Sequence, residues 1–492
     1  MKTALLALDA GTTQVKAIAY DEKATVLARA VRPVTTTYPG PGLVEQDASQ
    51  VLAASVEVLT EVLGRTGGKA KGVKALGIAN QRGSIVAWDS VSTKPLSPMI
   101  SWQDTRGAER CEQLQAAGFF VMPGMAASKA EWIMANIEAA AGAAAAGRLR
   151  MGTPNSWLVA GLCGGLHTCD HSNAFPSGLY DFADGDWSDA LLVELGLERA
   201  MLPELVDSKL VTGGLQAELL GAPVPLGCTS ADQQASLFGL GCLVEGSAKC
   251  TLGTSASVNL NTGGDLRLGG PGTFPLVAWR EDGVSTYCME GQVITAGEAL
   301  RWAAATLGFD GGPAALATQA ETADDCGGAW MIPALHGLGT PWQENNAQAQ
   351  LGGLSAAVGR AQLARATLEG VAHRVVDAAE GLWQTPGEAL SNEPLALEAL
   401  RVDGGASSSE LLLQMIADFT GTRVERSSDP DGGARGVALM AAAAVGLDPC
   451  EGDPGGGWSF DRVFEPTLTE ERRLEQRATW KARVQSLVEV SG

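Results

Sequence analysis

The chain has 492 residues, of which 45% are hydrophobic and 18% are charged, so it is long and apolar enough for two or three domain cores. Its 35 Lys and Arg residues against 56 Asp and Glu residues give a formal net charge of -21. A field of that sign repels nucleic acid and anionic lipid, which argues against a nucleic-acid partner and a membrane partner. A charge at Lys2 and the absence of an apolar run of roughly 18 residues also favour a chain without an export signal or membrane anchor.

The cysteines point to a reducing compartment. Nine of them are scattered between Cys111 and Cys450, with no C-x-x-C pair. This usage favours free thiols and a cytoplasmic location over a disulfide framework. One segment gathers metal-ligand types at irregular spacing that matches no zinc pattern, so we expect structural roles for Cys163, His167, Cys169, Asp170 and His171.

The first elements alternate between strand and helix. Residues 3–8 and 15–20 are predicted to be strands on either side of a turn at 9–13. A helix is expected from Asp47 to Leu63, and a buried strand at 73–79 precedes the triplet Asn80-Gln81-Arg82. Such alternation is typical of an α/β domain.

A related pattern returns in the second half of the chain. Strand-like residues 248–252 and 256–260 flank the turn Gly253-Thr254-Ser255. This recurrence predicts two domains of similar topology, with a boundary near residue 245. The expected later elements are a helix with an apolar stripe from Leu368 to Leu382, a strand at 397–402, a helix at 411–419 capped by Ser407, Ser408 or Ser409 and stopped by Gly421, and a small-residue helix at 434–445.

The two Gly-Thr turns are candidates for phosphate binding. Glycine lets a phosphate approach the backbone, and the turn offers N–H and O–H donors. Asp9 ends the first strand and could hold Mg²⁺, while Lys16 could add a positive charge. Each turn alone also fits an ordinary connection, but their recurrence, together with Asp403-Gly404-Gly405 after a further strand, favours nucleotide binding.

Asp232 is the candidate general base. It follows residues 224–228, which we expect to form a loop, and it begins a predicted helix. A helix N-terminus stabilises the carboxylate, which could then accept a proton from a hydroxyl group. The alternative is that Asp232 only caps the helix.

Taken together, several motifs resemble the FGGY family of carbohydrate kinases, which includes glycerol kinase and xylulokinase. Residues 349–354 with 362–369 also resemble the family's C-terminal signature, and the resemblance spans residues 3 to about 446. The shorter motifs occur in the family's order: Leu8-Asp9-Ala10-Gly11-Thr12-Thr13, Asn80-Gln81-Arg82, Ser101-Trp102-Gln103-Asp104, Ala231-Asp232-Gln233-Gln234, Leu252-Gly253-Thr254-Ser255 and Val402-Asp403-Gly404-Gly405.

The resemblance implies an α/β fold of two actin-like (ribonuclease H-like) domains flanking a deep catalytic cleft. Residues 1–245 would bind a sugar or polyol and carry the catalytic base, and residues 246–492 would bind the nucleotide. Asp232 matches the base and Asp9 lies near the metal and phosphates, so the implied cofactors are ATP and Mg²⁺. The matching substrate positions are Arg82, Trp102, Asp104 and Gln233. The matching nucleotide positions are Thr12, Thr13, Lys16, Gly253, Thr254, Gly297, Gly404, Gly405 and Ser409. Family resemblance also suggests a homo-oligomer, either a dimer or a tetramer, of which we expect the dimer.

The pattern departs from glycerol kinases around the substrate. Those enzymes follow the Gln-Arg pair with Glu, which bonds glycerol, whereas this chain has Gly83. A Tyr and a Phe near glycerol align with Gly124 and Ser257. These changes enlarge or repolarise the pocket, and Met122-Pro123-Gly124-Met125 with Lys129 and Trp132 looks more like xylulokinase. In contrast, Asn80-Gln81-Arg82, Asp232-Gln233-Gln234 and Gly337-Leu338-Gly339-Thr340-Pro341 look more like glycerol kinase, so both subfamilies stay open.

We therefore predict an ATP-dependent kinase for a polyol or ketose larger than glycerol, with four or five carbons. The alternative is a non-catalytic nucleotide-dependent binding protein, because actin-like folds also host such functions. The presence of both Asp9 and Asp232 argues against that alternative.

Overall fold

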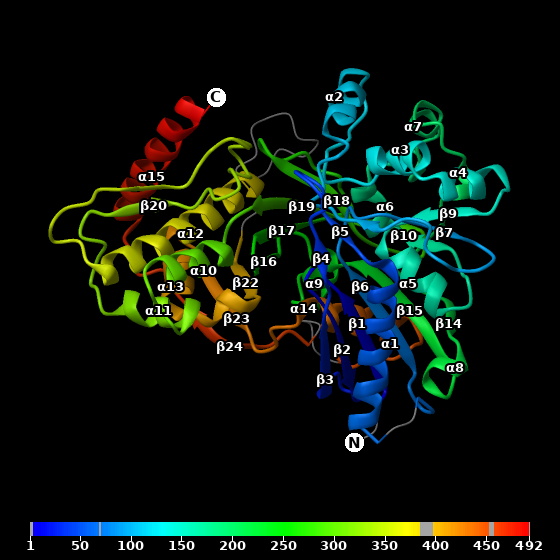
Figure 1. Ribbon diagram of the computed structural model, residues 1–492. Helices are drawn as coiled ribbons and strands as arrows, with labels where there is room; N and C mark the ends of the chain where they lie inside the picture. Colours follow the sequence, from blue (N-terminus) through cyan, green and yellow to red (C-terminus); the bar gives the residue numbers. More distant parts are fainter. Residues whose placement is uncertain (1–2, 68–69, 384–396, 452–456, 492) are drawn as a thin grey trace. The chain divides into compact units, whose positions relative to one another are not determined.

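A computed structural model describes residues 3–67, 70–383, 397–451 and 457–491 (Figure 1). The chain divides into two compact units. The first unit comprises residues 1–239, 277–285 and 433–457, and the second comprises 240–276, 286–432 and 458–492. Two segments beyond the predicted boundary near residue 245 therefore group with the first unit. Within the described ranges, no helix combines the length and the apolar character needed to cross a membrane.

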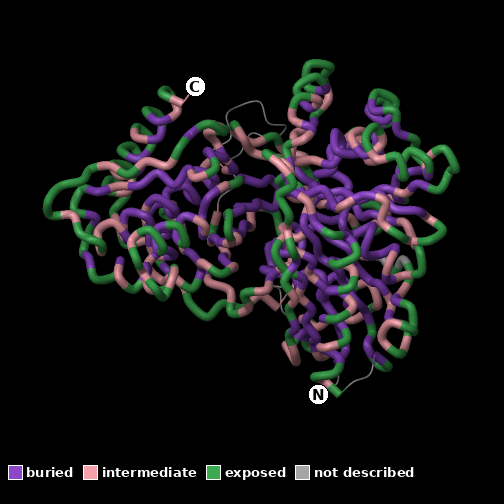
Figure 2. The backbone as a smooth tube through the Cα atoms, in the orientation of Figure 1, coloured by how far each residue is buried: buried purple, intermediate pink, exposed green. Residues whose placement is uncertain are grey.

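A six-stranded mixed sheet forms the centre of the first unit, and its four inner strands are largely buried (Figure 2). The strand order is β14-β15-β6-β1-β2-β3. The hairpin β1–β2 is antiparallel, whereas β1, β6 and β15 run parallel. The bounds are β1 (Leu5–Ala10), β2 (Gln14–Tyr20), β3 (Val26–Pro33), β6 (Ala75–Asn80), β14 (Lys209–Leu215) and β15 (Val224–Ala231).

Helix α1 (Ala48–Arg65) packs its apolar face into the core of this sheet. Asp47 caps its N-terminus by accepting from the amides of Ser49 and Gln50, so the predicted start is confirmed. Along this helix Leu52 and Val56 are half-buried, whereas Leu59 and Val62 are fully buried.

Helix α14 (Gly432–Ala444) confirms the small-residue helix predicted at 434–445, and it approaches its neighbours closely. A Cβ at Gly77 of β6 would lie 2.1 Å from the Val437 carbonyl oxygen. A Cβ at Gly436 would lie 1.8 Å from the Ala235 carbonyl oxygen. Only glycine allows backbones to meet at these distances, so α14 is fitted to the first unit at these two positions.

Shorter elements of the first unit surround a second apolar core. They follow β6 in the chain and carry several residues of the candidate site. Their bounds are β7 (Val86–Asp89), β8 (Met99–Ile100), α2 (Ala108–Ala116), α3 (Ala127–Asn136), α4 (Glu138–Ala145), β9 (Leu149–Gly152), α5 (Pro154–Leu162), β10 (Thr168–Asp170), α6 (His171–Ala174), α7 (Asp189–Glu194), β13 (Glu204–Val206) and α9 (Asp232–Gly239).

The second unit is built on a seven-stranded sheet with the order β18-β19-β17-β16-β22-β23-β24. Its helices α10, α11, α12 and α13 pack against one another or against the sheet. The strand bounds are β16 (Ala248–Leu252), β17 (Ala256–Gly263), β18 (Thr273–Glu281), β19 (Val284–Val293), β22 (Ala399–Asp403), β23 (Arg423–Ser427) and β24 (Phe460–Phe464). The helix bounds are α10 (Gly297–Thr306), α11 (Gly312–Glu321), α12 (Arg360–Trp383), α13 (Glu410–Thr420) and α15 (Glu470–Ser491).

The two sheets share one topology, as the recurring turn pattern predicts. In the first, β3-β2-β1 are antiparallel, β6 and β15 continue parallel, and β14 closes the edge antiparallel. In the second, β19-β17-β16, β22 with β23, and β24 repeat this arrangement in the same order. The prediction of two α/β domains with similar topology is therefore confirmed.

A buried carboxylate ties α15 to α12 in the second unit. Asp377 Oδ2 accepts from Arg374 Nη1 at 2.7 Å and from the indole N–H groups of Trp342 and Trp480 at 3.1 and 3.0 Å. Its Oδ1 accepts from Arg477 Nη2 at 2.6 Å. Burial alone would raise the pKa of Asp377, but the guanidinium groups of Arg477 and Arg374 lower it on balance. The ionised carboxylate of Asp377 therefore anchors α15 to α12.

Candidate active site

Three parallel strands of the first unit end at one edge of its sheet. Ala10 of β1 and Ala231 of β15 both pair with Asn80 of β6. The segments that follow these strands carry the first Gly-Thr turn, Arg82 and Asp232. Parallel topology thus brings together residues that lie more than two hundred positions apart in the chain.

Asp232 and Arg82 form an ion pair at this edge. Arg82 Nε lies 3.3 Å from Asp232 Oδ1, which also accepts from the amide of Gln233 at 2.8 Å. The side chain of Asp232 is 32% exposed and that of Arg82 is 16% exposed. The guanidinium stabilises the carboxylate as an anion, and the exposed part leaves it accessible to a substrate.

The segment before Asp232 is not the loop that the sequence suggested. Residues 224–231 form β15, which lies between β6 and β14, so the loop prediction is wrong. Pro225 disfavours a strand by its lack of an N–H group, but proline is tolerated near the start of a strand, where this residue lies. The strand places Asp232 directly at its end, on a rigid element.

The first Gly-Thr turn joins β1 to β2 and contains Thr12 and Thr13. Asp9 and Lys16 face each other across the hairpin, with Nζ 3.4 Å from Oδ2. Their side chains are 20% and 15% exposed. A carboxylate and an ammonium beside a turn with hydroxyl groups can hold a phosphate and a hard cation together.

Trp102 is connected to this turn by hydrogen bonds. Its Nε1 donates to Thr12 Oγ1 at 3.0 Å, and that hydroxyl donates to Gln81 Oε1 at 3.2 Å. The amide of Trp102 donates to Ser84 Oγ at 3.0 Å. The residue is 40% exposed, so its ring is fixed at one edge while part of its surface stays open. Gln81 was not predicted for the site, although it lies within the Asn-Gln-Arg motif.

Asp104 has a different environment from the one its predicted substrate role requires. The residue is fully buried. Its Oδ1 accepts from Arg106 Nε at 2.8 Å, and its Oδ2 accepts from the amide of Val44 at 2.6 Å. Although burial raises the pKa of Asp104, these hydrogen bonds and the charge of Arg106 lower it on balance. The geometry favours a supporting role beneath the Trp102 segment over direct contact with a substrate.

The second unit gathers its own glycine-rich edge. Gly297 begins α10, and its amide donates to the Gly253 carbonyl at 3.0 Å. A Cβ at Gly297 would lie 2.4 Å from that oxygen, so the helix N-terminus meets the second Gly-Thr turn only because the residue is glycine. The amides of Ala296 and Glu298 both donate to the Thr254 carbonyl at 3.1 Å. Gly253, Thr254 and Gly297 are therefore brought together.

Gly404 joins the same edge through β22, which pairs parallel with β16. It has φ +90°, and a Cβ there would lie 2.6 Å from the Leu252 carbonyl oxygen. A Cβ at Gly405 would meet nothing within 4 Å, so this backbone is open to a ligand. Ser409 caps α13 by accepting from the amide of Leu412 at 3.3 Å, which occupies the hydroxyl proposed for the nucleotide.

A chain of buried polar side chains lies next to the second Gly-Thr turn. The sequence analysis did not predict it. Lys249 Nζ donates to Thr251 Oγ1 at 2.8 Å, and this hydroxyl donates to Asp403 Oδ1 at 2.6 Å. Lys249 sits inside an apolar strand, and the pairing of β16 with β22 places Thr251 beside Asp403. No signal in the sequence links these residues.

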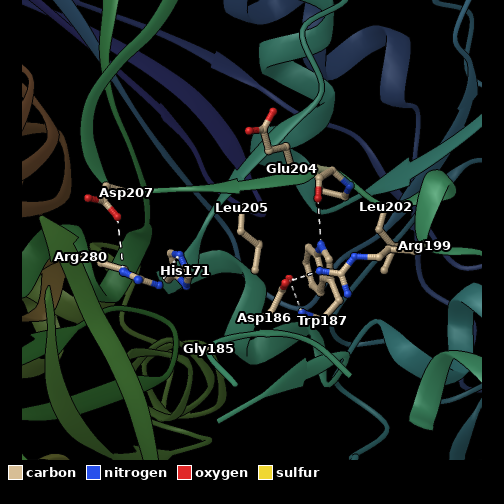
Figure 3. Close-up of a pocket in the computed structure, with 11 residues that line it drawn as sticks. His171, Gly185, Asp186, Trp187, Arg199, Leu202, Glu204, Leu205, Asp207 and Arg280 are labelled. Atoms are coloured by element: carbon tan, nitrogen blue, oxygen red, sulfur yellow. Dashed lines mark hydrogen bonds and ion pairs between the residues drawn. The ribbon is translucent and has the colours of Figure 1, made fainter. Parts of the chain in front are cut away.

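A polar pocket of about 520 Å³ lies elsewhere in the first unit (Figure 3). Arg280 Nε lies 3.4 Å from Asp207 Oδ1, and Arg280 Nη1 donates to His171 Nε2 at 3.0 Å. Arg199 forms an ion pair with Asp186. The charged groups of the pocket thus engage one another, and none of its residues was predicted for the site. The lining consists of His171, Gly185, Asp186, Trp187, Arg199, Leu202, Pro203, Glu204, Leu205, Asp207 and Arg280.

Two sheets of one topology, each with a glycine–threonine hairpin, and a strand-end carboxylate beside one hairpin are features of phosphotransferases with the actin-like, ribonuclease H-like fold. Comparisons with known proteins agree. The N-terminal domain of the FGGY family of carbohydrate kinases matches residues 4–239, and its C-terminal domain matches residues 248–445. The chain belongs to the FGGY family of carbohydrate kinases.

Individual relatives narrow the comparison. The chain is 35% identical to glycerol kinase from Natranaerobius thermophilus, covering 99% of this chain and 98% of that protein. It is 36% identical to glycerol kinase from Dechloromonas aromatica, covering 98% and 97%. Among solved structures, Plasmodium falciparum glycerol kinase with ADP superposes with a TM-score of 0.88 at 24% identity, covering 99% of both chains. A xyloylose kinase from Brucella ovis gives 0.82 at 26% identity, covering 98% of both chains.

These findings define the reaction class. The protein is a carbohydrate kinase that uses ATP to phosphorylate a hydroxyl group of a sugar or polyol. The alternative of a non-catalytic binding protein finds no support in them.

Proposed function

We propose that the protein phosphorylates a polyol or ketose of four or five carbons, with Asp232 as the general base. The observation that carries the assignment is the Asp232–Arg82 pair at the sheet edge that also carries Asp9 and Lys16. The first unit would bind the acceptor, and the second would bind the nucleotide around Gly253, Gly297 and the 404–405 turn.

In the proposed reaction, Asp232 accepts the proton of the acceptor hydroxyl. The hydroxyl oxygen forms a bond to the γ-phosphorus as the bond between that phosphorus and the β,γ-bridging oxygen breaks, which releases ADP. Arg82 holds the Asp232 carboxylate in place through their ion pair before the transfer. Lys16 and the hydroxyl groups of Thr12 and Thr13 offset the charge that spreads over the phosphoryl oxygens.

We also propose that Asp9 binds the Mg²⁺ that accompanies ATP. Mg²⁺ is held in kinases by one or two carboxylates plus phosphate oxygens, and Asp9 offers a partly exposed carboxylate beside the Gly-Thr turn. Among the described residues, no group of three or more His, Cys, Asp or Glu side chains could hold a metal ion by itself. The donor set therefore fits a cation shared with phosphates, and the bound cation would supply charge neutralisation.

Replacing Asp9 with Asn is expected to raise the Mg²⁺ concentration needed for half-maximal turnover by about tenfold, because the proposed anionic ligand is lost. The KM for the acceptor should stay near its wild-type value. Titrating Mg²⁺ at fixed ATP measures the first quantity, and titrating the acceptor at saturating Mg²⁺ and ATP measures the second. Asp21→Asn, in the exposed turn after β2, is the matched control. An unchanged Mg²⁺ requirement in Asp9→Asn would remove Asp9 from the metal site.

Gly83 and Gly124 argue against glycerol as the preferred acceptor through a lost contact, and not through added space. Gly83 has φ +70°, and a Cβ there would lie 2.3 Å from the Gly124 carbonyl oxygen. A Glu at this position, as in the glycerol kinases, has no room, so backbone forms this wall. Glycerol would lose that hydrogen bond, worth about 1 kcal/mol or more. Ser257 contributes less to this argument, because its hydroxyl bonds Glu290 and Asn259.

An acceptor panel tests the proposal directly. ADP release is measured with glycerol, four- and five-carbon polyols, and four- and five-carbon ketoses, each against a control without acceptor. We expect the best four- or five-carbon acceptor to exceed glycerol in kcat/KM by about tenfold or more, the value of one to two hydrogen bonds. Glycerol as the best acceptor would overturn the size argument, and ADP release that needs no acceptor would overturn the kinase assignment.

A homodimer and a cytoplasmic location are further proposals. All nine cysteines are free, which supports a reducing compartment. Family resemblance supports the dimer, and light scattering of the purified protein would measure it.

A further inference from the structure

Lys129 is a lysine without solvent exposure in the first unit. It lies in the first turn of α3, and its ammonium group donates to three backbone carbonyls. The distances from Nζ are 2.8 Å to Ser101, 3.2 Å to Gly124 and 3.4 Å to Gly83. An ammonium has three N–H donors, so these three acceptors match its full donor set.

The three carbonyls belong to the three segments that carry the proposed acceptor pocket. Gly83 follows Arg82, Ser101 precedes Trp102, and Gly124 forms the wall opposite Gly83. A Cβ at Gly83 would lie 2.3 Å from the Gly124 oxygen and 3.3 Å from the Trp102 Cβ. The segments at Gly83 and Ser101 are also joined by the hydrogen bond from the Trp102 amide to Ser84. Lys129 adds a contact to all three segments at once.

The surroundings of Lys129 explain how the charge is tolerated. The ionisable groups that act on it are Asp104, Arg106 and Cys111. Burial lowers the pKa of Lys129 to about 7, and Asp104 opposes that shift. A buried charge is costly unless it is hydrogen-bonded, and an apolar side chain would fill the same space without that cost. The three carbonyl bonds are the specific gain from lysine.

We propose that Lys129 is the positioning residue of the acceptor pocket, which fixes Arg82 and Trp102 relative to Asp232 and thereby sets acceptor affinity and selectivity without acting on ATP. This inference rests on the proposed function, since it requires Arg82 and Trp102 to face the acceptor. Lys129 itself touches no reacting atom and acts through the segments that it joins.

The test is Lys129→Met, which keeps the length and volume and removes the donors. We expect the KM for the best panel acceptor to rise by about tenfold or more, while the KM for ATP stays within about twofold. The ratio of kcat/KM between the best and the second acceptor should fall. Ile133→Ala, at another buried position of α3, is the matched control: it should lower the unfolding midpoint and leave both KM values unchanged.

The wild-type enzyme provides a second measurement that needs no variant. Three neighbouring groups keep their protonation state between about pH 6 and pH 8.5. The pKa of Asp104 is lowered, and the pKa values of Arg106 and Cys111 are raised. Lys129 alone of these groups loses a proton there, and with it one N–H donor. The KM for a neutral acceptor at saturating ATP should therefore rise several-fold with pH.

The outcomes separate the two proposals. If the wild type phosphorylates no acceptor of the panel, the proposed function fails. If it phosphorylates one but Lys129→Met raises both KM values equally, or neither, only the role of Lys129 is overturned. If Lys129→Met does not fold, an acceptor KM that stays flat across the pH range overturns that role instead.

Discussion

Asp232→Asn should lower turnover by about 10²- to 10⁴-fold, the usual contribution of a general base. The amide keeps the shape of the side chain but cannot accept the acceptor's proton. It also removes the anion that faces Arg82 at 3.3 Å. ATP should bind as in the wild type, because the proposed nucleotide residues are Gly253, Thr254 and Gly297.

This prediction is checked by initial rates of ADP formation with the best panel acceptor, together with an equilibrium measurement of ATP binding. Asp207→Asn is the matched control, because Asp207 also pairs with an arginine of the first unit, at 3.4 Å, but lies in the separate pocket of Figure 3. Its turnover should stay close to that of the wild type. Near-normal turnover in Asp232→Asn would exclude the general-base role.

Asp377→Asn should lower the free energy of unfolding of the second unit by about 3–5 kcal/mol, as expected when a buried ion pair loses one partner. Two guanidinium groups, of Arg374 and Arg477, would lose their common anion, and the new amide would present donors to donors. The pKa of Asp377 is lowered in the folded state. Its contribution to the free energy of unfolding is therefore fully present above the ordinary carboxyl pKa. It is lost as the pH falls through the lower folded-state value.

Urea unfolding of both forms at neutral pH measures this effect. Asp461→Asn is the control, since Asp461 pairs with Arg426 at 2.8 Å with its side chain 47% exposed, and exposed pairs contribute about 0–1 kcal/mol. A loss below about 1 kcal/mol in Asp377→Asn would show that the cluster does not stabilise the unit.

Much of the fold could be predicted because local signals agree with the tertiary structure. Asp47 caps α1, Ser409 caps α13 and Gly421 ends it in a left-handed conformation, as predicted. The stripe from Leu368 to Leu382 is buried along α12. The failure at residues 224–231 has a physical reason: neighbouring strands on both sides stabilise β15 in spite of its proline, and pairing with distant segments leaves no local pattern.

In the candidate site, too, some residues could be predicted from the sequence and others could not. Asp9 and Arg82 lie at the ends of predicted strands and share an edge because those strands run parallel. Asp232 joins them at the end of β15, which the sequence predicted as a loop. The environments of Asp104 and Lys129 depend on Val44, Gly83 and other residues from distant segments. Such contacts arise from tertiary packing. The sequence patterns therefore predict the motifs but not which residues contact Asp104 and Lys129.

The placement of α14 has a practical consequence for dissecting the protein. This helix follows β23 in the chain, yet it belongs to the first unit and meets Gly77 backbone to backbone. A fragment truncated at residue 245 would uncover that surface of the sheet and lack a part needed for its own folding. Separately expressed halves are therefore expected to aggregate. Binding and activity should be measured on the intact polypeptide.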